Sequence, residues 1–261
     1  MDTKENQGTL YRVRKELEII AEADYKKFSA SLIPGVENLL GIRIPILRNM
    51  AKKLAKEDWK GCMEWEDTVY FEEIMLQGLV LGYAKAPVEE ILEYARKFIP
   101  KIDNWSINDS FCSNFKIARK EPQKVWDFVM TYKDSRDEFK IRVVAVMLMD
   151  HFLNDDHIDD VLKVLGELEI VGYYTSMGVA WAYATAWAKY PEKTKSYLKE
   201  HPIEPETYHK TLRKCLESYR ISHKDKNWIR SEELSKYRKN APRGCAKIVP
   251  QFLRLTEELM K

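Results

Sequence analysis

The segment Phe71-Glu72-Glu73-Ile74-Met75-Leu76 opens a region in which an aromatic residue recurs at intervals of 34 positions, at Phe71, Trp105, Phe139 and Tyr173. Each aromatic residue is followed by a stretch with the pattern of a helix. A fixed interval of this length is typical of repeat proteins. A single helix pair cannot bury its apolar face, so neighbouring pairs must stack, and such stacks curve into a superhelix with a concave wall. The pattern predicts an all-α solenoid whose function resides on that wall.

The rest of the chain also has a predominantly helical pattern. Residues 10–23 place Leu10, Val13 and Leu17 at helical spacing. Pro34-Gly35 cannot continue a regular helix, whereas Pro45 suits a first helical turn. Further helices are predicted over residues 45–56, 66–84, 88–98, 104–118, 122–132, 136–152, 156–168, 173–189, 192–200 and 207–220. No alternating strand pattern of useful length occurs.

Composition and repeat together favour one domain over residues 1–261. Hydrophobic residues make up 45% of the chain and charged residues 32%, which provides material for an extended core and a charged surface. Within this domain, residues 222–261 are predicted to form a basic segment and a last capping helix. Its apolar positions are Ile248, Phe252, Leu255 and Leu259.

The positive charge of the chain is concentrated near its C-terminus. Residues 201–261 contain 14 Lys or Arg against 8 Asp or Glu, whereas residues 1–200 contain 29 against 33. This basic end could meet a polyanion, or its charges could simply be solvated along helix faces.

Cysteine usage and the absence of apolar segments indicate a cytoplasmic protein without a metal or other cofactor. Cys62, Cys112, Cys215 and Cys245 lie far apart and lack the paired spacing of zinc ligands, and they fit a reducing compartment. The sequence begins without the apolar core of a signal peptide. No window reaches the roughly 18 apolar residues that a membrane-spanning helix needs.

Four residues form a candidate functional site. Trp105 and Asp109 lie four positions apart, so a helix places both side chains on one face. Arg142 interrupts an apolar run in the next repeat, and Trp181 stands in the repeat after that. A buried Arg142 would be costly unless it faced Asp109. Three structural alternatives remain open: tryptophan is usually a core residue in helical repeats, Asp109 could cap its helix, and Arg142 could pair with it only for stability.

These residues make the chain resemble the HEAT-like-repeat DNA glycosylases of the AlkD type. The resemblance extends from about Tyr25 to about Arg220. It is carried by Leu40-Gly41-Ile42-Arg43-Ile44-Pro45-Ile46-Leu47-Arg48, by Trp105 with Asp109, by Arg142 in its apolar helix, and by Trp181 ahead of Lys189-Tyr190-Pro191. The fold it implies is a right-handed superhelical solenoid of HEAT-like repeats with a concave cleft.

The resemblance also implies an activity, which is excision of cationic N3- or N7-alkylated purines from duplex DNA by hydrolysis of the N-glycosidic bond. The family's catalytic aspartate falls on Asp109, its aromatic cleft residues on Trp105 and Trp181, and its cleft arginine on Arg142. A positively charged purine leaves as a neutral base and needs no general acid. The carboxylate would instead stabilise positive charge that develops on the sugar, and the two indoles would contact the lesion through their π faces.

Contacts with DNA phosphates are expected from cations on the inner helices, and Arg142 should hold one phosphate. The other candidates are Arg43, Arg48, Lys116, Lys189, Arg213, Lys214 and Arg220. Members of the family place helices before the Leu-Gly-Ile segment to grip the duplex. Pro34-Gly35 interrupts that stretch here, so we expect a grip that is shortened or absent.

Two other functions fit the same sequence. One is a DNA-binding homologue that keeps the aromatic and acidic cleft without excising bases. The other is a helical scaffold that binds a protein partner along its concave surface.

Overall fold

The computed structural model describes residues 3–233, and every regular element in that range is a helix. The helices are α1 (Thr3–Ile20), α2 (Ala23–Leu32), α3 (Ile44–Met63), α4 (Phe71–Tyr83), α5 (Val88–Phe98), α6 (Trp105–Asn114), α7 (Pro122–Met130), α8 (Glu138–His151), α9 (Ile158–Glu167), α10 (Tyr173–Lys189), α11 (Pro191–Glu200), α12 (Pro205–Glu217) and α13 (His223–Trp228). A 3-10 turn covers Ile99–Lys101, a second covers Lys116–Arg119, and a π turn covers Ile229–Glu233.

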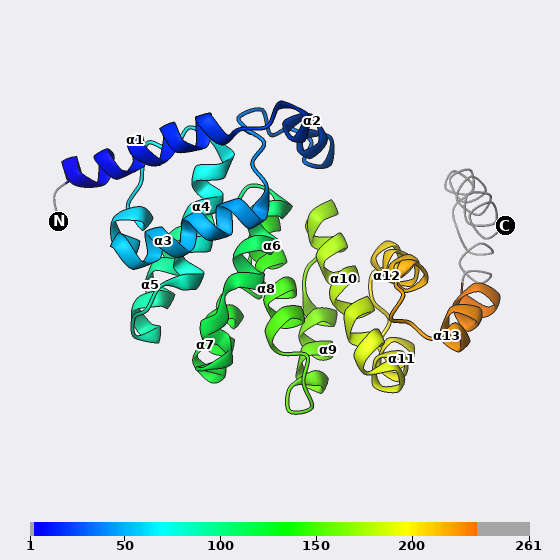
Figure 1. Cartoon of the computed structure of the whole chain (residues 1–261). Helices are drawn as coiled ribbons and strands as arrows, with labels where there is room; N and C mark the ends of the chain where they lie inside the picture. Colours follow the sequence, from blue (N-terminus) through cyan, green and yellow to red (C-terminus); the bar gives the residue numbers. More distant parts are fainter. Residues whose placement is uncertain (1–2, 234–261) are drawn as a thin grey trace.

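The helices pair into a two-layered stack (Figure 1). In one layer α4, α6, α8, α10 and α12 pack against one another in chain order, and α3 packs on α4. The other layer contains α5, α7, α9 and α11, which lie along the lower edge of the view. This arrangement confirms the predicted all-α array of stacked helix pairs. Its right-handed superhelical twist stays a prediction.

The aromatic residues that recur in the sequence mark equivalent positions in the repeats. Phe71, Trp105 and Tyr173 are the first residues of α4, α6 and α10, and Phe139 is the second residue of α8. Contacts between repeats join residues separated by approximately the same interval. For example, the Asn114 amide donates to the carbonyl of Leu79 at 2.8 Å. The sequence period therefore corresponds to one helix pair.

The predicted helices are present, with differences near breaks in the pattern. The helix expected over residues 66–84 begins only at Phe71, and the one expected over 104–118 divides into α6 and a 3-10 turn. Helix α3 runs on to Met63 through a kink at Asp58, whose φ of −157° is not helical. Pro122 and Pro191 begin α7 and α11, as expected.

Helix α2 is an element that the sequence analysis did not predict. Pro34 and Gly35 do follow its end, but two helices, α1 and α2, precede the Leu40-Gly41-Ile42 segment. Helix α1 packs on α3 through Leu10, Val13 and Leu17, all buried. The shortened or absent grip on DNA expected from this region stays a prediction.

A buried carboxylate and a glycine fix the segment between α2 and α3. Glu72 is 1% exposed, and the backbone N–H groups of Leu40 and Gly41 donate to it at 2.9 and 2.8 Å. Gly41 has a φ of +91°, which favours glycine. Helix α2 also passes so close that a Cβ on Gly41 would lie 2.5 Å from the backbone nitrogen of Lys26.

The described part of the C-terminal region covers the end of the array. Trp228 of α13 packs near Trp187 of α10, with 6.0 Å between ring centroids, and Asp225 pairs with Lys195 of α11 at 3.6 Å. The capping helix predicted around residues 248–259, most of the basic segment and Cys245 lie outside the described residues.

Replacing Gly41 by alanine should destabilise the protein more than the same change at Gly35. Both glycines have a positive φ, +91° and +88°, so both variants incur the strain of an L-residue in that region, about 1–2 kcal/mol. Only Gly41→Ala also forces overlap with α2, whereas nothing lies within 4 Å of a Cβ at Gly35. We expect an additional loss of about 1–3 kcal/mol in the free energy of unfolding, measured by urea denaturation. Equal losses would contradict the close packing of α2.

Candidate functional site

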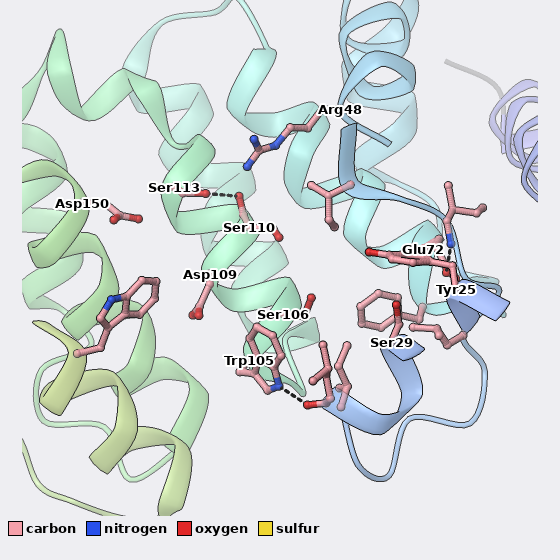
Figure 2. Close-up of a pocket in the computed structure, with 17 residues that line it drawn as sticks. Tyr25, Ser29, Arg48, Glu72, Trp105, Ser106, Asp109, Ser110, Ser113 and Asp150 are labelled. Carbon is pink, nitrogen blue, oxygen red and sulfur yellow. Dashed lines mark hydrogen bonds between the residues drawn. The ribbon is translucent and has the colours of Figure 1, made fainter. Parts of the chain in front are cut away.

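A cleft of about 370 Å³ lies where α2, α3, α6, α8 and α10 approach one another. Its lining includes Trp105 and Asp109 of α6 and Trp181 of α10, three of the four residues singled out from the sequence. Figure 2 shows Asp109 between the Trp105 side and the Asp150 side of this cleft. The acid therefore faces neither the outer layer nor the interior of the stack.

The carboxylate of Asp109 is not used to cap α6, because another residue caps that helix. The side chain of Asn104 accepts hydrogen bonds from the backbone N–H groups of Ser106 and Ile107, both at 3.0 Å. Asp109 stands more than one turn into α6, with a side chain 16% exposed. Its alternative interpretation as an N-terminal cap is therefore excluded.

Arg142 lies beneath Asp109 and holds it in a two-pronged ion pair. Arg142 Nε donates to one oxygen of Asp109 at 2.9 Å, and Nη2 donates to the other at 2.8 Å. The third donor, Nη1, bonds the carbonyl of Tyr174 at 2.6 Å. The predicted pairing across adjacent repeats is present, and it satisfies the buried guanidinium. The phosphate contact expected of Arg142 stays a prediction, and its side chain is only 6% exposed.

A glycine makes room for this arginine. A Cβ on Gly178 of α10 would lie 3.2 Å from Arg142 Cγ and 3.3 Å from Nη1. The ion pair is therefore enclosed by three helices: α6 provides the acid, α8 the base and α10 the space.

Burial and charge oppose each other at Asp109. Burial raises the pKa of its carboxyl group, and the hydrogen bonds and positive charge of Arg142 pull that pKa down. The charge of Lys214 on α12 acts in the same direction as Arg142. Burial in turn lowers the pKa of Lys214. Lys214 is therefore close enough to the Asp109–Arg142 pair for its charge to affect the pKa of Asp109.

The two cleft tryptophans differ from tryptophans of the core. Trp65 and Trp187 are 2% and 1% exposed, and neither indole N–H has a partner among the described residues. Trp181, in contrast, is 38% exposed at the cleft. Trp105 is half-buried, and its indole N–H donates to the carbonyl of Leu32 at 3.1 Å. The end of α2 thus sets the orientation of the Trp105 ring (Figure 2).

The predicted phosphate contacts are scattered over several elements, and their roles stay predictions. Arg48 is exposed and lines the cleft, whereas Arg43 bonds Glu22 and stacks 4.8 Å from the Tyr25 ring. Lys189 donates to the carbonyl of Leu153. Of the remaining candidates, two are exposed, Lys116 and Arg220, and two are half-buried, Arg213 and Lys214.

The structure adds residues that the sequence analysis missed. Ser106, Ser110 and Ser113 share the cleft face of α6, which their helical spacing with Asp109 could have indicated. Asp150, at the end of α8, also lines the cleft. Tyr25 comes from α2, and nothing in the sequence pattern links it to α6.

The described part of the chain contains no candidate for two other kinds of site, a membrane-spanning helix and a metal centre. Between residues 3 and 233, no helix is both long and apolar enough to cross a membrane. No group of His, Cys, Asp and Glu side chains in that range could hold a metal ion.

Replacing Arg142 by methionine should strongly destabilise the fold, because it leaves the carboxylate of Asp109 buried without its partner. We expect a loss of about 3–5 kcal/mol at neutral pH in denaturant unfolding. The pKa of Asp109 in the folded variant should rise further above its unfolded value. Stability should therefore be retained at low pH, where the carboxyl is neutral, and lost as the pH rises.

The double variant Arg142→Met with Asp109→Asn is the matched control. Because it removes the buried charge as well, it should recover much of the lost stability. A double variant as unstable as the sum of the two single variants would show that the pair is not coupled.

Comparison with known proteins assigns the chain to a family. A search of curated proteins finds no match. The family model described as "DNA alkylation repair enzyme" matches residues 13–216, a range that contains the cleft residues of α2 to α10 and Lys214 of α12. The match covers well over half of the chain, and the chain therefore belongs to the DNA alkylation repair enzyme family.

Proposed function

We propose that this protein is a DNA glycosylase that hydrolyses the N-glycosidic bond of N3- or N7-alkylated purines in duplex DNA. The observation that carries the proposal is the position of Asp109, in a cleft that it shares with Trp105 and Trp181. Family membership supports DNA alkylation repair as the process.

The residue types suit a reaction that develops positive charge on a sugar. An alkylated purine is already cationic, so it departs as a neutral base. As the bond lengthens, C1′ gains oxocarbenium character, which a fixed carboxylate stabilises. Asp109 would do this and orient the attacking water. Trp105 and Trp181 would hold the sugar and the cationic base against their π faces, each with a contribution of roughly 0.5–2 kcal/mol.

Arg142 would act mainly on Asp109. Its bidentate hydrogen bonds favour the ionised carboxylate and fix its direction, although burial has the larger effect and raises the pKa of Asp109 overall. Each carboxylate oxygen retains a second lone-pair site for a water molecule or the sugar. The orientation of Asp109 and its free lone-pair sites are therefore compatible with the proposed role.

One feature favours a second candidate, a DNA-binding homologue without excision. Both oxygens of Asp109 already accept hydrogen bonds from Arg142, so part of its charge is compensated. Such a protein would bind duplex DNA through the same cleft and release no base.

A base-release assay on methylated duplex DNA tests the proposal. The wild type should release alkylated purine, and Asp109→Asn should lower the rate by about 10²–10³-fold while DNA affinity is retained. Asp109→Asn keeps the shape of the side chain, and its folding is checked by thermal unfolding. Binding without release by the wild type would favour the second candidate, and failure to bind duplex DNA at low salt would reject both.

Salt dependence of DNA binding tests the phosphate contacts. Arg48 is exposed at the cleft and makes no ion pair with a described residue, whereas Arg43 is paired with Glu22. Arg48→Gln should therefore reduce the slope of log K against log salt by about one, and Arg43→Gln should reduce it less. Equal slopes for wild type and Arg48→Gln, measured by fluorescence anisotropy, would remove Arg48 from the phosphate contacts.

A further inference from the structure

The charge of Asp109 is largely cancelled within the cleft. Its two oxygens lie 2.9 and 2.8 Å from nitrogen atoms of Arg142, which has no other acidic partner among residues 3–233. A pair of opposite charges at this separation acts on a more distant group as a dipole, whose field is weaker than that of a free charge. The pair therefore attracts a cation beyond its immediate contacts less strongly than a free carboxylate would.

Asp150 is a second carboxylate in the same cleft, and it lacks such compensation. It lies in the last turn of α8, is exposed, and lines the cleft together with Asp109 and Trp181. No hydrogen bond or ion pair joins its side chain to another residue in the described range. Figure 2 shows Asp150 on the α8 side of the cleft, with Arg48 on the α3 side.

The charged surroundings of Asp150 come from four helices. Asp109 faces the cleft from α6 and Arg48 from α3, while Arg142 of α8 and Lys214 of α12 act on Asp109. Although Asp150 has an exposed surface, the surrounding cleft walls partly desolvate its carboxyl group and raise its pKa to about 6, and the negative charge of Asp109 contributes in the same direction. Its neighbour His151 donates a hydrogen bond from Nε2 to the carbonyl of Cys112 at 2.7 Å, and burial lowers the pKa of its imidazole. At neutral pH Asp150 is therefore ionised.

We propose that Asp150 is a substrate-contact residue that supplies the uncompensated negative charge for the cation bound in the cleft. This inference rests on the proposed glycosylase function and divides its electrostatic task between two acids. Asp109, held by Arg142, is directed at the reacting sugar. Asp150 attracts the positively charged nucleotide and, beside Trp181, selects it over a neutral one.

The experiment compares two duplexes that differ in charge at one nucleotide. One contains a pyrrolidine in place of the sugar, which is protonated and resembles the oxocarbenium ion. The other contains the neutral tetrahydrofuran analogue. The ratio of the two dissociation constants reports cation selectivity, independently of general DNA affinity.

Asp150→Asn should lower this selectivity about tenfold, the size expected for loss of one charge contact in a partly hydrated cleft, and should leave affinity for the neutral duplex unchanged. Asp150→Glu should restore most of the selectivity. Asp156→Asn, an equal change of net charge at an exposed position outside the cleft, should have no effect on it.

Selectivity should also depend on pH. In the wild type it should decrease as the pH falls from 7.5 to 5, because Asp150 becomes protonated across its pKa of about 6. In Asp150→Asn the remaining dependence reports Asp109 alone and should be smaller.

The outcomes separate this inference from the proposed function. If the wild type releases alkylated bases and prefers the cationic duplex, but Asp150→Asn keeps that preference, the role of Asp150 is overturned and the glycosylase function stands. If Asp156→Asn reduces selectivity as much as Asp150→Asn, the effect is one of net charge, and the role is again overturned. If the wild type releases no base, the proposed glycosylase function is overturned, and the role of Asp150, which rests on it, is overturned with it.

Discussion

The buried ion pair between Asp109 and Arg142 joins the architecture of this protein to its site. Arginine in the middle of an apolar helix is tolerated only where its charge and donors are satisfied, and here one carboxylate and one carbonyl satisfy them. The carboxylate comes from one repeat, the arginine from the next and the carbonyl from a third. The pair therefore exists only when successive repeats are stacked in register, and stacking places the acid at the cleft.

The opposite wall of the cleft depends on a second buried carboxylate. Glu72 binds the backbone of the segment before α3, and Gly41 allows α2 to lie directly on that segment. The end of α2 then accepts the hydrogen bond of the Trp105 indole. Two acids of the same chain thus have different tasks: Glu72 is almost completely enclosed and positions backbone, whereas Asp109 retains access to the cleft.

Charge compensation limits what a single acid can contribute in such a site. Arg142 orients Asp109 and lowers the pKa that burial raises, but it also reduces the field that Asp109 exerts on a ligand. A cleft that receives a cation benefits from another acid without a partner, and Asp150 meets that description. Orientation and attraction are then provided by separate residues, on α6 and α8.

The sequence by itself determined the repeat, because a period of 34 residues reflects local helix pairs. Spacing within and between these pairs singled out Trp105, Asp109, Arg142 and Trp181 as candidates, and the family resemblance gave them their predicted roles. The sequence did not reveal α2, because residues 23–32 have no strong apolar period at helical spacing. Pro34-Gly35 indicated only that no regular helix continues through that point. Only the tertiary structure decided that Asn104 rather than Asp109 caps α6, that the Trp105 indole bonds Leu32, and that Asp150 shares the cleft. These facts depend on side-chain directions and on contacts between elements far apart in the chain, which helical periodicity does not encode.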